Sequence, residues 1–155
     1  MGPSGSGKTT IARALAQSLH LQVVAAEVLH PPANVENMRA GRPLDDADRA
    51  PWLDAVARAM QGAAGVAVAC SALKRRYRDQ LRAAAGPLYF VLPQVPRIDL
   101  MQRLSARTGH YMPPALLDSQ LADLQMLSED EPGVCVDGTR ELGAQVQFIR
   151  SRLGL

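Results

Sequence analysis

The sequence is poor in aromatic side chains, histidine and cysteine, and each shortage argues against a class of function. Aromatic residues make up only 4 % of the chain, too few for the stacking platform that single-stranded nucleic acids require. The three histidines have no ligand-like spacing and there are only two cysteines, so structural zinc is not expected. Because Cys70 and Cys135 lie in the short apolar runs VAVAC and GVCVD, we expect buried, reduced thiols in a cytoplasmic protein.

Long apolar runs and an excess of one charge are also missing. No run approaches the roughly 20 apolar residues that cross a bilayer, and the Gly/Ser-rich start lacks the apolar segment that export requires. The 17 Lys and Arg nearly balance the 15 Asp and Glu, and the net charge of +2 demands no polyanionic partner. We therefore expect no membrane and no nucleic-acid partner. The 155 residues suit a single domain with a sizeable core.

Short apolar runs alternate with helical patterns along the whole chain. The expected strands are residues 21–27, 65–70, 88–93 and 133–137. The expected helices are residues 8–20, a short one at 35–40, one starting near residue 51, and residues 74–85, 97–107 and 141–153, with a mobile segment at 108–124 that leads into a short helix. This alternation predicts the α/β class, a three-layer fold whose parallel sheet is covered by helices on both faces. Ligands are then expected at the carboxyl ends of the strands.

The first ten residues contain a phosphate-binding loop. MGPSGSGKTT matches the pattern G-x-x-x-x-G-K-[ST], and a well-patterned helix follows at once. Glycines let successive backbone N–H groups turn toward phosphate oxygens, and the helix N-terminus adds positive potential. Lys8 is expected to reach the β- and γ-phosphates of ATP as a catalytic cation, and the Thr9 hydroxyl to join the Mg²⁺ shell. The expected nucleotide-binding residues are Gly2, Pro3, Ser4, Gly5, Ser6, Gly7, Lys8, Thr9 and Thr10.

No strand precedes this loop in the sequence, although such a loop normally leaves the end of a buried strand. Without that strand, the two strands on either side of its place would be left with unpaired backbone groups, each costing roughly 1–3 kcal/mol. We therefore expect residues 1–155 to form a single P-loop kinase domain whose first strand is missing and whose natural start lies upstream of Met1. Expressed alone, these residues are expected to have low stability.

The remaining motifs favour a small-molecule kinase over other nucleotide-binding proteins. The sequence has no N-K-x-D motif, with which GTPases recognise their base, and it is too short for the extra elements of a mechanical ATPase. A small-molecule kinase needs a second pocket and a closing lid, for which residues 107–124 are the candidate. Arg103 and Arg107 share one helix face and could swing onto the γ-phosphate as catalytic cations; the alternative is that they are ordinary helix-end arginines. His110, Tyr111 and Met112 would belong to the lid.

Four segments together resemble one kinase family. They are GPSGSGKTT, LHPPANVENMRAGRPLDDADRAPWL, ACSALKRRYRD and RLSARTGHYMPPALLDSQLADLQ, and they are similar to segments of the gluconokinases of the shikimate-kinase-like group. The resemblance runs from Gly2 into the last strand. It implies ATP- and Mg²⁺-dependent transfer of the γ-phosphoryl group to the 6-hydroxyl of D-gluconate, giving 6-phosphogluconate and ADP. It also suggests a homodimer.

Gluconate carries a carboxylate and a row of hydroxyls, so its pocket should contain cations and hydrogen-bonding side chains. The expected substrate-binding residues are His30, Arg49, Lys74 and Arg78. Arg49 is the first candidate for the carboxylate or a nearby hydroxyl; the alternative is an ion pair with Asp46 or Asp48. The other three candidates follow the strands 21–27 and 65–70, where the substrate sites of α/β folds gather.

The family pattern breaks at the end of the strand 21–27. The family shows an Asp-x-Asp arrangement there, whose first carboxylate holds Mg²⁺ waters and whose second faces the reacting hydroxyl, whereas this chain has Ala25 and Glu27. Alanine cannot bind a metal, and Glu27 carries its carboxylate roughly an ångström further out, a displacement that can cost about a hundredfold in rate. We expect Glu27 to act as both base and Mg²⁺-water partner. The alternatives are another acid, Asp45 or Asp46, or little phosphoryl transfer; the stretch DDAD is otherwise expected to cap the next helix.

Two rival functions stay open from the sequence. One is another small-acid kinase such as shikimate kinase, although the GG-type turn expected after the third strand is replaced by CSALK. The other is a nucleotide-binding protein without turnover, which Ala25 and the missing strand both favour. Adenine is expected between the loop helix, the lid arginines and residues after GVCVD such as Thr139.

Overall fold

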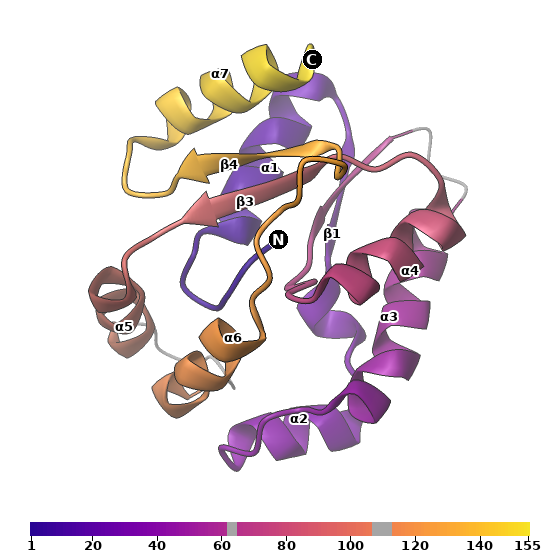
Figure 1. Cartoon of the computed structure of the whole chain (residues 1–155), viewed down its shortest axis with the longest axis vertical. Coiled ribbons are helices and arrows are strands. Elements are labelled where there is room, and N and C mark those ends of the chain that lie inside the picture. Colours follow the sequence, from indigo (N-terminus) through magenta and orange to yellow (C-terminus); the bar gives the residue numbers. More distant parts are fainter. Residues whose placement is uncertain (62–64, 107–112) are drawn as a thin grey trace.

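The structure is a computed structural model, and it describes residues 1–61, 65–106 and 113–155. Within these residues strands and helices alternate as the sequence predicts (Figure 1). The strands are β1 Gln22–Ala25, β2 Val66–Ala69, β3 Phe90–Gln94 and β4 Gly133–Asp137. The helices are α1 Lys8–Leu19, α2 Pro32–Arg39, α3 Asp46–Met60, α4 Arg75–Ala85, α5 Arg97–Ser105, α6 Leu117–Asp123 and α7 Leu142–Leu153. Short 3₁₀ turns lie at Ala26–Leu29 and Pro114–Leu116.

Helix α3 begins at Asp46 rather than near residue 51, because its start is strongly capped. The carboxylate of Asp45 accepts a hydrogen bond from the N–H of Asp48 at 2.8 Å, and the Asp48 carboxylate accepts one from the N–H of Asp45 at 3.1 Å. This reciprocal pair satisfies two of the N–H groups that a helix start leaves unpaired. The acidic stretch DDAD is therefore a helix cap, as expected, and Pro51 lies inside the helix.

Strand β1 is shorter than expected, and Glu27 does not lie on it. The strand ends at Ala25, and the chain continues as the 3₁₀ turn that contains Glu27. Helix α2 then begins at Pro32 instead of within residues 35–40, since the fixed φ of proline suits the first helical turn. Glu27 thus leaves the sheet edge on a tight turn, and whatever holds that turn sets the position of its carboxylate.

The four strands form two parallel pairs, β1 with β2 and β3 with β4, rather than one continuous sheet. At the first position of each pair the register joins Gln22 to Val66 and Phe90 to Gly133. The start of the chain lies between the pairs. The amino group of Met1 donates to the carbonyl oxygen of Val91 at 2.6 Å, and the N–H of Gly2 donates to that of Ser71 at 2.9 Å.

An apolar cavity of about 610 Å³ separates β2 from β3. Its walls include Val66 and Val68 of β2, Phe90 and Val91 of β3, and Leu15 of α1. In the described structure β2 and β3 are each hydrogen-bonded to one neighbouring strand only. The expected missing first strand and the expected natural start of the chain both stay predictions.

Helices cover both faces of the strands, and each face has its own core. Helices α3 and α4 pack together on one face, where the core includes Trp52, Leu53, Val56, Tyr77, Leu81, Phe90 and Leu92. Helices α1 and α7 pack together on the other, where the core is Ile11, Leu15, Val134, Val136 and Ile149. Full burial of each large apolar side chain contributes roughly 1.5–3 kcal/mol. The predicted three-layer α/β arrangement with parallel strands is confirmed (Figure 1).

The two cysteines are free thiols. Cys70 is buried at the end of β2, and Cys135 is half-buried on β4. Burial raises the pKa of the Cys70 thiol to about 11, so this thiol is inert near neutral pH. The expectation of a buried thiol is confirmed for Cys70, whereas Cys135 is only partly buried.

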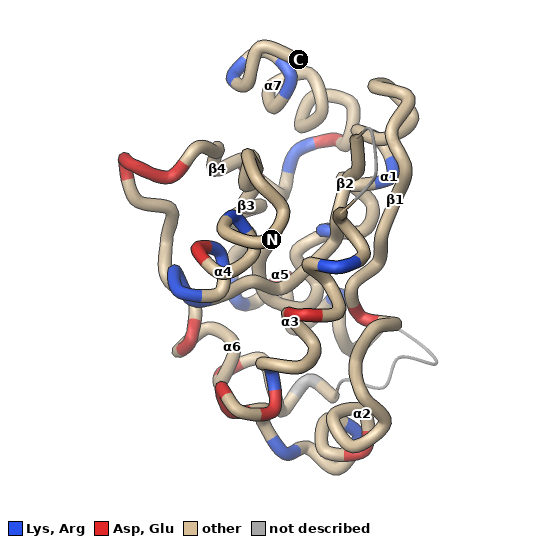
Figure 2. Tube along the Cα trace, turned by 90° about the vertical axis from the view of Figure 1, so that its right-hand side faces the viewer, with Lys and Arg blue, Asp and Glu red and all other residues tan. Residues whose placement is uncertain are grey.

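Charged residues of both signs are interspersed along the trace (Figure 2). This distribution matches the near-balance of acidic and basic residues in the composition. Among the residues described, none of the helices combines the length and the apolar character that crossing a bilayer would need.

Candidate active site

The phosphate loop is shaped by glycines and opens onto a cavity at the carboxyl ends of the strands. Gly5 and Gly7 have φ angles of 83° and 89°, a left-handed conformation that strains other residues. Gly7 is the N-cap of α1 and supplies no side-chain cap, so the first N–H groups of that helix suit an anion. Residues Ser4 through Thr10 line the cavity, which has a volume of about 560 Å³.

Gly2 and Pro3 support the loop from behind instead of lining the cavity. The N–H of Gly2 is bonded to Ser71, and the carbonyl oxygen of Pro3 accepts a hydrogen bond from Nζ of Lys8 at 2.8 Å. Ser6 is 1 % exposed, and its Oγ has no hydrogen-bond partner among the described residues. Because a buried polar group without a partner is unfavourable, this orphaned hydroxyl and the glycine cradle fit a phosphate group.

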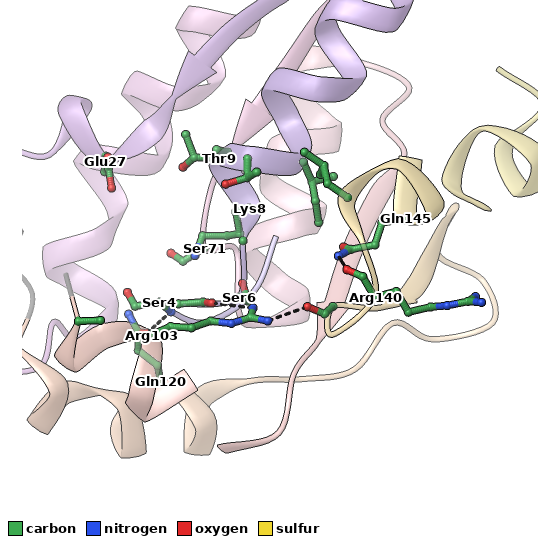
Figure 3. A pocket seen from close by; sticks show the side chains of 18 of the residues that line it. Ser4, Ser6, Lys8, Thr9, Glu27, Ser71, Arg103, Gln120, Arg140 and Gln145 are labelled. Carbon is green, nitrogen blue, oxygen red and sulfur yellow. Dashed lines mark hydrogen bonds between the residues drawn. The ribbon is translucent and has the colours of Figure 1, made fainter. Parts of the chain in front are cut away.

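Arg103 of α5 lies beside the phosphate loop (Figure 3). Its Nη1 donates to the carbonyl oxygen of Gly5 at 3.3 Å, and its Nη2 donates to that of Gly138, just after β4, at 3.0 Å. The guanidinium is therefore fixed in the cavity lining and adds positive charge where phosphates would bind. The expected partner Arg107 lies outside the described residues, as does the part of the lid with His110, Tyr111 and Met112.

Glu27 lines the same cavity as Lys8 and Thr9 (Figure 3). Its turn is held by Trp52 of α3, whose Nε1 donates a buried hydrogen bond of 2.7 Å to the carbonyl oxygen of Ala26. Helix α3, fixed by its capping box, therefore sets where the Glu27 carboxylate lies. Glu27 is the one carboxylate among the described residues that line this cavity.

His30 stacks on the indole of Trp52, with ring centroids 4.3 Å apart and an interplanar angle of 9°. Burial lowers the pKa of His30 to about 4; the positive charge of Arg49 also lowers it, and Glu27 opposes the shift in part. The imidazole is therefore neutral at physiological pH, with one ring nitrogen that donates and one that accepts. A neutral imidazole suits hydroxyl groups better than a carboxylate.

A second, smaller pocket adjoins the cavity. Its polar groups come from His30, Arg49, Ser71, Ser119 and Gln120, and its apolar walls are Met38, Pro43, Leu44, Trp52 and Leu116. The two pockets are continuous, because four residues line both of them: His30, Trp52, Ser71 and Gln120. This pocket has a volume of only about 30 Å³, so its cation and hydrogen-bonding groups suit one end of a small hydroxylated acid, whose remainder would extend into the larger cavity.

Arg49 is buried in this second pocket, at 7 % exposure. Its Nη1 donates to the hydroxyl of Tyr77 at 3.1 Å and to Oδ2 of Asp123 at 2.9 Å. The alternative role considered from the sequence, an ion pair with Asp46 or Asp48, is not what the described residues show. The partner is instead Asp123, the last residue of α6.

Arg78 does not reach either pocket, which corrects its expected role in substrate binding. It is fully buried beside Glu131, to which its Nε and Nη2 donate at 2.5 and 2.8 Å. Its remaining N–H groups donate to the backbone carbonyl oxygens of Ala72, Leu73, Gln125 and Met126. Every donor of the guanidinium is thus used inside the protein, where it ties α4 to the segment before β4.

Lys74 is also absent from the residues that line the two pockets, contrary to expectation. Its Nζ lies 3.2 Å from Oδ1 of Asp46 and 3.1 Å from Oδ1 of Asp123. Burial disfavours the charge of Lys74, but the hydrogen bonds to Asp123 and Asp46 outweigh this and raise its pKa. Lys74 therefore supports the pocket through the two aspartates.

The described residues contain no group of three or more His, Cys, Asp or Glu side chains placed to hold a metal ion. In kinase sites, Mg²⁺ usually binds through one or two protein groups together with substrate phosphates. Thr9 and Glu27 line the phosphate cavity, whereas Ala25 offers no ligand. These residues fit a Mg²⁺ ion that arrives with the nucleotide better than a permanent metal centre.

Sequence reasoning missed several residues of the cavity lining: Ser71, Gln120, Arg140, Leu142 and Gln145. Gln120 also contacts the phosphate loop directly, since its Oε1 accepts a hydrogen bond from the N–H of Ser4 at 2.7 Å (Figure 3). Ser71 follows β2 in the segment ACSALK, so its position at a strand end could have identified it. Gln120 lies in the segment RLSARTGHYMPPALLDSQLADLQ, which carries the family resemblance, but sequence reasoning assigned it no role.

The expected adenine contact, Thr139, does not line the cavity. Its N–H and its hydroxyl both donate to Oδ1 of Asp137, at 2.9 and 2.6 Å, which closes a tight turn after β4. The residues on either side of it, Gly138 and Arg140, do line the cavity. The segment thus contributes to the cavity lining through these two residues, and adenine binding there stays a prediction.

Comparisons with known proteins agree with this geometry. A family model described as an AAA domain matches residues 1–127. The chain is 47 % identical over 144 residues to a gluconokinase of Gluconobacter oxydans, covering 90 % of this chain and 81 % of the relative. It superposes on the crystal structure of a gluconokinase from Sinorhizobium meliloti 1021 with a TM-score of 0.89 and 40 % identity, covering 99 % of this chain and 89 % of the other. A shikimate kinase from Bacteroides thetaiotaomicron shares the fold alone, with a TM-score of 0.65 at 16 % identity over 100 % of this chain and 96 % of the other.

Proposed function

The chain belongs to the gluconokinase family, and we propose that it transfers the γ-phosphoryl group of ATP to the 6-hydroxyl of D-gluconate, giving 6-phosphogluconate and ADP. The observation that carries this proposal is a phosphate-loop cavity that is continuous with a pocket holding a buried arginine. A nucleotide in the first, and a sugar acid that reaches from the second into the first, would have their reacting groups side by side. Holding two reactants in this way supplies much of the catalysis of phosphoryl transfer.

On the nucleotide side, the residues supply positive charge and N–H donors. Lys8 and the loop amides bind phosphate oxygens, and Arg103, held by two carbonyl oxygens, adds charge beside them. Mg²⁺, when bound with ATP, neutralises phosphate charge, and Thr9 is the residue that we expect to hold it. Arg107 belongs to this set by its sequence position.

On the acceptor side, Glu27 accepts the proton of the attacking hydroxyl. The two other acids considered from the sequence are engaged elsewhere. Asp45 caps α3. Asp46 is bonded to Tyr77, Lys74 and Arg76, and the hydrogen bond from Tyr77, followed by those from Lys74 and Arg76, lowers the pKa of its carboxyl to about 2, too low for a useful base.

The carboxylate end of gluconate would lie in the second pocket, whose volume is about 30 Å³, and the rest of the molecule would lie in the larger cavity. Arg49 binds the carboxylate, since a guanidinium matches two carboxylate oxygens. Neutral His30 bonds a hydroxyl, and Ser71 and Gln120 offer further polar groups. Because His30, Ser71 and Gln120 line both pockets, the sugar chain would extend from Arg49 toward the phosphate loop.

The proposal is tested by measuring ADP production with D-gluconate, with other sugar acids and with shikimate. We expect turnover that depends on gluconate and on Mg²⁺. Turnover with shikimate but not gluconate would favour the rival small-acid kinase. Saturable ATP binding without phosphate transfer to any of these acids would favour the rival nucleotide-binding protein.

We also propose a cytoplasmic location and a homodimer. The location is supported by the two free thiols in apolar surroundings, and the homodimer by the family resemblance. Light scattering on the purified protein tests the second point, and a mass of 16.7 kDa at micromolar concentration would contradict it.

A further inference from the structure

The guanidinium of Arg49 is anchored through a single nitrogen. Both hydrogens of Nη1 are used, one by the hydroxyl of Tyr77 and one by Oδ2 of Asp123. Nε and Nη2 have no hydrogen-bond partner in the part of the chain that the structure describes. Nε and Nη2 are not among the fully buried polar atoms that lack a partner, and Arg49 lines the second pocket, so their three N–H groups are accessible to a ligand there.

The unpaired edge has the shape that a carboxylate requires. Nε and Nη2 present two parallel N–H groups, and an arginine binds a carboxylate through such a pair. Arg49 lines the second pocket together with His30 and Gln120, so a ligand carboxylate in this pocket can reach that edge. Asp123 uses the other end of the guanidinium and therefore does not occupy the position that the ligand needs.

Asp123 is itself held in place from two directions. Oδ1 of Asp123 lies 3.1 Å from Nζ of Lys74. The positive charge of Lys74 balances the negative charge of Asp123, so the Asp123 carboxylate does not cancel the charge of Arg49. It is also the last residue of α6, and Gln120 on the same helix accepts the hydrogen bond from Ser4 in the phosphate loop. The contact that orients Arg49 is therefore built on the helix that is bonded to the nucleotide site.

We propose that Asp123 is a positioning residue, which with Tyr77 holds Arg49 by Nη1 so that its Nε/Nη2 edge faces the carboxylate of the acceptor. This inference rests on the proposed function, because it needs a sugar acid in the second pocket. It assigns Lys74 an indirect role, through Asp123, in place of the substrate contact expected from the sequence. It also predicts that Asp123 and the acceptor carboxylate bind the same guanidinium without competing.

The test compares Asp123→Asn with the matched control Asp118→Asn. Asp118 lies on the same helix but at the surface, where it forms an exposed ion pair of 2.9 Å with Arg97. Steady-state kinetics would give KM for gluconate, KM for ATP and kcat for both variants. We expect Asp123→Asn to raise KM for gluconate by about tenfold or more, the effect of losing one charge-assisted hydrogen bond, with KM for ATP changed less than about twofold. Asp118→Asn should match the wild type.

A second measurement separates orientation of Arg49 from general loosening of the pocket. D-Glucitol carries the hydroxyls of gluconate without its carboxylate, and its affinity as an inhibitor should be the same in Asp123→Asn and in the wild type. Loss of affinity for both ligands would mean that the pocket as a whole is damaged, and would overturn the proposal. If Asp123→Asn does not fold, Tyr77→Phe removes the other anchor of Nη1 and should give the same selective loss.

The outcomes distinguish this inference from the proposed function. A wild-type protein that does not phosphorylate gluconate overturns both. An active wild type with an Asp123→Asn variant equal to Asp118→Asn overturns the positioning role alone. Tighter binding of gluconate by Asp123→Asn would show that Asp123 competes with the ligand, and would also overturn it.

Discussion

Replacing Arg78 by methionine should destabilise the fold without weakening gluconate binding. The side chains of Arg78 and Glu131 are both 0 % exposed, and the guanidinium donates to Glu131 and to four backbone carbonyl oxygens. In Arg78→Met the carboxylate of Glu131 stays buried and keeps only the N–H of Ser128 at 3.1 Å and the more distant guanidinium of Arg75 at 3.9 Å. Removing one partner of a buried ion pair lowers the free energy of unfolding by about 3–5 kcal/mol. This is a large share of the roughly 5–15 kcal/mol that stabilises an ordinary domain.

Urea unfolding of the single variant and of Arg78→Met/Glu131→Gln checks this reasoning. The double variant buries no unpaired charge and should recover roughly half of the loss. The carbonyl oxygens of Ala72, Gln125 and Met126 still lose a donor, each worth about 1 kcal/mol, whereas that of Leu73 keeps the N–H of Gln125. Its KM for gluconate should equal that of the wild type, because Arg78 lines neither pocket. A tenfold higher KM in a double variant of near-normal stability would refute the structural role and return Arg78 to the substrate site.

Three further substitutions test the catalytic side of the site. Glu27→Gln should lower kcat by about 10²–10⁴-fold, as loss of a general base does, while ATP affinity stays within about twofold; equal losses in both would rule out the role of base. Trp52→Phe removes the hydrogen bond to the carbonyl oxygen of Ala26, so the free energy of unfolding should fall by about 1–3 kcal/mol, and kcat should fall as well. An unchanged kcat would mean that other contacts hold the turn that carries Glu27. Because the pKa of His30 is about 4 in the folded chain and 6.5 at its ordinary value, the pH dependence of KM for gluconate should show no inflection from His30 near pH 6.5. As pH falls from 6.5 to 4, His30 is protonated in the unfolded chain before it is protonated in the folded chain, so the free energy of unfolding of the wild type should decrease in that window. His30→Phe, which keeps an aromatic ring on Trp52, should not show this decrease. Parallel pH profiles of unfolding free energy for the two proteins would contradict the shifted pKa.

The parts of this protein that the sequence predicted well depend on residues that are close together in the chain. The phosphate loop needs only the spacing of its glycines, Lys8 and Thr9, and the helix after it follows from its own apolar stripe. The acidic stretch caps α3 through residues three positions apart, Asp45 and Asp48. The alternation of strands and helices then determined the three-layer class. Strand lengths were less predictable, because pairing with a neighbour decides where β1 ends.

The roles of the basic residues were decided only by the tertiary structure. Arg49, Lys74 and Arg78 were all candidates for substrate binding from the sequence, with Arg49 the first, yet the structure places Arg49 in the pocket, Lys74 behind it and Arg78 in the core. The partners that separate them, Asp123 and Glu131, lie 74 and 53 positions away along the chain. A basic side chain can bind a ligand only when its N–H donors are not all used by nearby carboxylates. Which carboxylates lie nearby is decided by the packing of α6 and of the segment before β4 against α3 and α4.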